Sequence, residues 1–164
     1  MAEREILFRA KAINRDKGYH RTNYKNGDWV YGLVTRLYDE RFENLPAEMT
    51  DTSGVSGIEV DYKTIGQYTG LTVANGKVFN GDFLKFGDRI LEVFWNRESF
   101  QWQAKQIDTD LEIYRSGLGD HYDYGWTITD LGWIAAEEVI TGRMTTEIIG
   151  NKWDNPEILK NSSP

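Results

Sequence analysis

The densest group of side chains that could do chemistry is the run Asp120-His121-Tyr122-Asp123-Tyr124. His121 could act as a general base, with Asp120 or Asp123 orienting its ring, as a hydrolase would require. The chain has no cysteine and no serine in an activated-nucleophile pattern. A hydrolase centred on His121 is therefore only the third function we consider, and the sequence predicts a protein that is not an enzyme.

A second group of carboxylates has a spacing that could suit a metal ion. Asp108, Asp110 and Glu112 stand two residues apart, so on a strand they would share one face and could hold a divalent cation. The same spacing on an exposed strand makes a charged edge that discourages pairing with another chain. No phosphate-binding loop, dinucleotide fingerprint or HExxH motif is present. The sequence predicts neither a metal site nor a cofactor.

Aromatic and acidic residues together favour binding to another protein. The chain has six Trp, nine Tyr and seven Phe, and its net charge is −7. Residues 105–138 are the most acidic stretch, with two basic residues against eight acidic ones. Rings beside carboxylates suit a basic or proline-rich peptide, or a cationic protein surface. We therefore predict a binding site for a host or phage protein in this region, with a basic partner favoured by the charge. The site would be formed by Tyr114, His121, Tyr122, Tyr124 and Trp126.

An alternative is nucleic-acid binding near the N-terminus. Six basic residues lie within 17 positions, with Tyr19, His20 and Tyr24 among them; they are Arg9, Lys11, Arg15, Lys17, Arg21 and Lys25. Asp16 interrupts this patch, and a chain with a net charge of −7 repels polyanions at long range. Nucleic acid is therefore the first alternative to a protein partner, ahead of the hydrolase.

Short β-prone segments separated by tight turns dominate the chain. Strands are predicted around residues 5–11, 29–35, 58–62, 78–79, 83–86, 89–95 and 99–104. Asn-Gly pairs, which tolerate positive φ, predict turns at Asn26-Gly27 and Asn75-Gly76. The alternation in residues 99–104 predicts Phe100, Trp102 and Ala104 on one buried face, with Gln101 and Gln103 on the other.

These elements predict a mainly β protein. Closing a small barrel or roll would remove the exposed strand edges that invite aggregation. A short helical turn is expected near residues 155–159, where Asn155 and Pro156 suit the start of a helix. Trp29, Tyr31 and Tyr68 are expected to fill the interior.

Segments spread along the whole chain resemble one protein family. They occur in the family's order at residues 6–11, 27–32, 64–71 continuing through 75–82, and 147–159. Together they resemble the YopX-like proteins of phages and prophages. The resemblance implies a mainly β fold with an SH3-type barrel, a phage or prophage origin, and no established activity, cofactor or ligand.

We therefore expect a single YopX-like domain over residues 1–164. Its barrel core would span about residues 60–104, with the N- and C-terminal segments packed around it. The expected role is that of a non-catalytic accessory protein that acts through protein contacts, and self-association stays open. No stretch approaches 18 apolar residues, so we expect no membrane partner. With the absence of cysteine, this fits the cytoplasm of a bacterial host.

Overall fold

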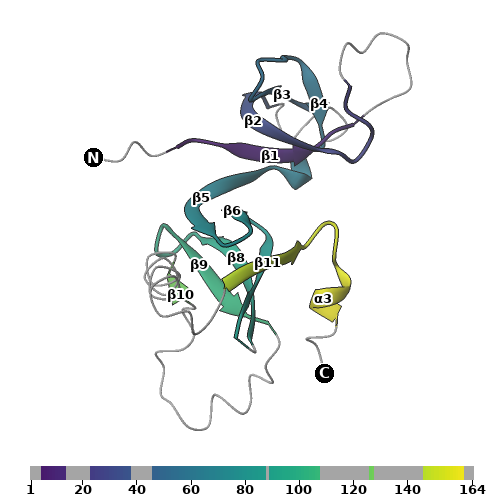
Figure 1. Ribbon diagram of the computed structural model, residues 1–164. Coiled ribbons are helices and arrows are strands. Elements are labelled where there is room, and N and C mark those ends of the chain that lie inside the picture. Colours follow the sequence, from purple (N-terminus) through teal and green to yellow (C-terminus); the bar gives the residue numbers. More distant parts are fainter. Residues whose placement is uncertain are drawn as a thin grey trace, which may run out of the picture. The chain divides into compact units, whose positions relative to one another are not determined.

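The computed structural model describes residues 5–13, 23–37, 46–87, 89–107, 126–127 and 146–160 (Figure 1). Antiparallel strands in two sheets make up most of it, which confirms the predicted mainly β fold. The chain divides into two compact units, Met1–Tyr68 and Thr69–Pro164, and each is described by itself. The stretch expected as the barrel core, residues 60–104, contributes strands to both sheets.

The first sheet has six strands in the order β4-β3-β2-β1-β5-β6. They are β1 (Phe8–Lys11), β2 (Trp29–Arg36), β3 (Ala47–Asp51), β4 (Ile58–Val60), β5 (Gly66–Val73) and β6 (Gly76–Phe79). A single 3-10 turn, η2 (Tyr62–Thr64), separates β4 from β5. Strand β5 begins in the first unit and continues into the second, where the predicted turn at Asn75-Gly76 joins it to β6.

The first sheet curls until the end of β1 meets β4. Ala12, just after β1, forms an antiparallel bridge with Val60, and the Asp61 amide donates to the Lys11 carbonyl at 2.8 Å. The Lys11 amide in turn donates to the hydroxyl of Thr64 in η2, also at 2.8 Å. These bonds pair the strand edges that would otherwise be left open to other chains.

One face of this curled sheet forms the core of the first unit. Ala10 of β1 lies opposite Val30 of β2, and both are fully buried. The same cluster contains Ala12, Ala47, Met49, Ile58 and Val60. Because side chains alternate along a strand, the residues between these positions lie on the other face.

The second sheet has five strands in the order β10-β9-β8-β7-β11. They are β7 (Asp82–Phe86), β8 (Arg89–Asn96), β9 (Gln101–Gln106), β10 (Trp126–Thr127) and β11 (Thr146–Asn151). Its core contains Leu71, Val73, Val78, Leu84, Phe86, Leu91, Val93, Trp102 and Ala104. The predicted C-terminal helical turn is confirmed as α3 (Glu157–Lys160).

A single asparagine ties the C-terminal strand to the β5–β6 turn. The Asn75 side-chain nitrogen donates to the Ile148 carbonyl at 2.8 Å, and its oxygen accepts the Ile148 amide at 2.8 Å. The side chain thus satisfies both backbone groups of Ile148, as a neighbouring strand would. Two of the segments that carry the family resemblance, residues 75–82 and 147–159, therefore lie against each other.

The turn between β6 and β7 is built around Gly81. The Asp82 carboxylate, which is fully buried, accepts the Phe79 amide at 2.8 Å. Gly81 has φ +85°, and a Cβ on it would lie 2.6 Å from the ring of Trp153. The amide of Lys152 donates to the Gly81 carbonyl at 3.0 Å. Glycine is needed here for the backbone conformation and for the space that the indole occupies.

Two glycine substitutions separate the requirement for a positive φ from the requirement for space beside Trp153. Gly70 in β5 has φ +92°, but a Cβ there would meet nothing within 4 Å. Gly70→Ala should lower the free energy of unfolding by about 1 kcal/mol through backbone strain alone. Gly81→Ala should cost about 2–4 kcal/mol, because overpacking against Trp153 adds to the strain. Urea unfolding measures both, and equal losses would contradict the role assigned to Trp153.

Candidate protein-contact site

Most of the site residues predicted from sequence lie outside the described part of the chain. This holds for the protein-binding candidates Tyr114, His121, Tyr122 and Tyr124, and for the basic residues Arg15, Lys17 and Arg21. Trp126 lies in β10, where its backbone is paired opposite Ala104. Arg9, Lys11 and Lys25 of the predicted basic patch are described, and the structure brings the first two together in β1.

The pairing of β1 with β2 places cations beside aromatic rings. Arg9 lies opposite Tyr31, and Lys11 lies opposite Trp29. Paired residues share a face of the sheet, and this is the face opposite the core. Lys25 is exposed in the turn that precedes β2, where its amide donates to the Asp28 carboxylate at 2.8 Å.

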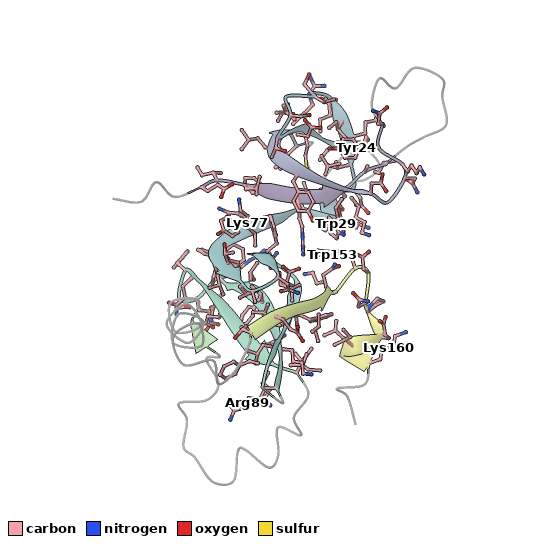
Figure 2. The ribbon with its side chains drawn as sticks, in the orientation of Figure 1. Tyr24, Trp29, Lys77, Arg89, Trp153 and Lys160 are labelled. Atoms are coloured by element: carbon pink, nitrogen blue, oxygen red, sulfur yellow. The ribbon has the colours of Figure 1, made fainter. Side chains whose placement is uncertain are left out.

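The indole of Trp29, which is labelled in Figure 2, makes cation–π contacts with two basic side chains. The guanidinium carbon of Arg9 lies 4.6 Å from the ring centre, and the ammonium nitrogen of Lys11 lies 4.7 Å from it. Arg9 is buried and Lys11 is half-buried, and such a contact contributes about 0.5–1 kcal/mol at an exposed position and about 2 kcal/mol where the groups are desolvated. The two contacts hold the ring and the ammonium group in a defined arrangement.

The expectation that three aromatic residues fill the interior is correct only for Tyr68. Tyr68 is buried, whereas Trp29 is half-buried and Tyr31 is 40% exposed. Val30 and Gly32, the alternate residues of β2, take the inner positions instead. The core of the first unit is filled mainly by alanine, valine and methionine side chains. The larger rings of Trp29 and Tyr31 therefore lie on the outer face.

Large apolar side chains continue this face beyond the rings. Leu33, two residues after Tyr31 on the same face, is 52% exposed. Lys11, Trp29, Tyr31 and Leu33 are called the outer strip below. Single exposed apolar residues are ordinary on protein surfaces, but a contiguous row bordered by charge is typical of a binding surface. The sequence signal was the aromatic and aliphatic alternation at positions 29, 31 and 33.

A buried carboxylate close to β2 has a structural role. Asp51, at the end of β3, accepts the Ser53 hydroxyl at 2.7 Å, the Val55 amide at 2.9 Å and the Tyr24 hydroxyl at 2.9 Å. The hydrogen bond from Ser53, followed by that from Val55, lowers the pKa of Asp51 against the opposing effect of burial. Burial, and then the hydrogen bond to Asp51, raises the pKa of Tyr24 (labelled in Figure 2). The carboxylate fixes the β3–β4 turn and ties the Tyr24 segment to the sheet.

Metal binding and membrane crossing find no support within the described residues. No group of three or more His, Asp or Glu side chains there could hold a metal ion. In the same part of the chain, no helix has the length and apolar character needed to cross a membrane.

The lowered pKa of Asp51 predicts an acid-sensitive fold. A depressed carboxyl pKa contributes stability above its ordinary value of 3.8, and this contribution disappears as the pH falls through the lower folded value. The free energy of unfolding should therefore drop below about pH 4. Asp51→Asn should cost about 1–3 kcal/mol at pH 7 and should flatten this drop. Denaturant unfolding between pH 7 and pH 2 measures both effects, and an unchanged acid slope in the variant would contradict the assignment.

Comparison with known proteins identifies no relative: no family model matches the sequence, and a search of curated proteins gives no match.

Proposed function

We propose that this chain is a YopX-like phage or prophage protein that acts in the bacterial cytoplasm as a non-catalytic protein-binding module. The four segments that carry the resemblance and the mainly β fold support this assignment. The observation that carries the binding role is the outer strip, in which the exposed Tyr31 and Leu33 continue a row from Trp29 and Lys11 on one face of the sheet.

The apolar end of the outer strip favours a protein over other partners. Burying the exposed parts of Tyr31 and Leu33 against apolar side chains would gain about 25 cal/mol for each Å² removed from water. Lys11, held over Trp29, would lie beside this contact and favour an acidic group on the partner. The proposed partner of this strip is therefore a protein with an apolar patch next to a carboxylate. The basic partner predicted for residues 105–138 concerns a different part of the chain, outside the described residues.

Nucleic acid is the second candidate for the same surface. Trp29 and Tyr31 beside Lys11 combine rings that can stack on bases with a cation that can bind a phosphate, whereas Arg9, which is only 6% exposed, is too buried to do so. Leu33 offers no stacking face, and the net charge of −7 opposes a polyanion. The hydrolase alternative rests on His121, which lies outside the described residues, and is not proposed.

Substitution of Leu33 tests the protein-binding role. Tagged wild-type chain should enrich a protein from a nuclease-treated bacterial host lysate, and Leu33→Ser should lose that protein because the apolar contact is gone. Val55→Ser is the matched control, since Val55 is a 38% exposed aliphatic residue in the β3–β4 turn and is not one of the four residues of the strip. Quantitative mass spectrometry of the captured proteins gives the comparison. Both variants should keep the wild-type unfolding free energy within about 0.5 kcal/mol.

The competing outcomes are distinct. Equal capture by Leu33→Ser and wild type would rule out the outer strip as the binding surface. A low-salt gel shift of single-stranded DNA that Lys11→Gln weakens and Leu33→Ser leaves unchanged would favour the nucleic-acid alternative instead.

A further inference from the structure

The hairpin formed by β8 and β9 ends in a four-residue connection. Trp95 lies opposite Trp102, and Asn96 lies opposite Gln101, so residues 97–100 form the turn. The rings of Trp95 and Trp102 meet edge to face, with centroids 5.1 Å apart. This end of the hairpin belongs wholly to the second unit.

Side-chain hydrogen bonds fix the conformation of the turn. The Asn96 oxygen accepts the Glu98 amide at 2.9 Å and the Ser99 amide at 3.2 Å. The Asn96 nitrogen donates to the Gln103 side-chain oxygen at 2.9 Å. Gln103 was predicted on the polar outer face, but it is only 2% exposed. Its side-chain amide tolerates burial because it forms hydrogen bonds with Asn96 and Ser99. The turn is therefore rigid before any partner binds.

Phe100 has an unusual backbone conformation at the end of this turn. Its φ is +51°, and no other non-glycine residue in the described part of the chain has a positive φ. Turns of this kind favour glycine or asparagine at such a position, because a Cβ is unfavourable there. The prediction that Phe100 faces inward is wrong: the residue precedes β9, and its side chain is 77% exposed.

Two unfavourable features thus meet in one residue. The fold would be served equally well by glycine at position 100, and the phenyl ring there stays in water. A residue that breaks a local rule without a gain for the fold marks a functional position. We propose that Phe100 is a contact residue whose ring inserts into an apolar pocket of a partner protein. This goes beyond the outer strip, because it gives the second unit a binding site of its own.

The chemistry of the turn favours a protein pocket over a membrane. Arg97 and Glu98 are both exposed and leave the turn locally neutral, which suits an uncharged pocket. The second unit has nine basic and fifteen acidic residues, so anionic lipid would repel it. One ring is too small to anchor a chain to lipid, whereas a single buried aromatic residue can dominate a protein interface. Because hydrogen bonds already fix the backbone of the β8–β9 turn, less conformational entropy is lost when Phe100 binds a partner.

The first test separates the fold from the contact. Phe100→Gly should raise the melting temperature by about 2–4 °C, because glycine relieves the backbone strain and the ring makes no contribution to the core. Phe100→Tyr should melt within about 1 °C of wild type, since it keeps both the ring and the strain. A clear loss of stability in Phe100→Gly would show that the ring serves the fold and would overturn the proposal.

The second test looks for the partner directly. The chain with photoreactive benzoylphenylalanine at position 100 should form one discrete covalent adduct with another protein in a bacterial host lysate. Excess wild-type chain and Phe100→Tyr should suppress the adduct, and Phe100→Gly should require at least a tenfold higher concentration. Leu33→Ser should compete as well as wild type, because it leaves the β8–β9 turn and the Phe100 ring unchanged.

The opposite results are equally clear. No adduct, an adduct that Phe100→Gly suppresses as well as wild type, an adduct between two copies of this chain, or a label found only on lipid would each overturn the proposal.

Discussion

The register of β1 against β2 is the constraint from which the first unit and its outer strip both follow. Ala10 and Val30 face each other in the core, so Arg9, Lys11 and Tyr31 must lie on the opposite face. A slip of one residue would turn Lys11 toward the core and Ala10 toward the outer face. The row of exposed side chains is thus fixed by the packing behind it, and it keeps its geometry when no partner is bound.

The second unit exposes an aromatic residue for a different reason. Register also fixes the β8–β9 turn, because Trp95 and Trp102 must pair at its base. That pairing requires a left-handed residue at position 100 but does not require a ring there. The position of the outer strip therefore follows from the packing of the fold, whereas the fold does not require the aromatic side chain of Phe100. The second kind of exposure is the stronger indication of a contact.

Local patterns predicted many of the strands and turns, but they missed β3 and did not show which face of a strand is buried. Alternation showed that Trp29 and Tyr31 share a face, yet both faces of β2 carry apolar residues, and the core selected the smaller ones. Phe100 was misplaced because the alternation of β9 was extended one residue past its start. The bond between Asn75 and Ile148 spans 73 positions, and no local pattern encodes it. The predicted sites at Tyr114 and His121 lie outside the described residues.

The size of the two proposed contact sites limits the affinity that either can give. A stable protein interface uses about 20–30 residues from each side, far more than the outer strip or the β8–β9 turn offers. Each site alone should therefore bind weakly or transiently. The two sites differ in setting, since the first unit has a net charge of −1 and the second of −6. Salt should therefore weaken the acidic partner's hold on Lys11 and leave the apolar contact of Phe100 largely unchanged.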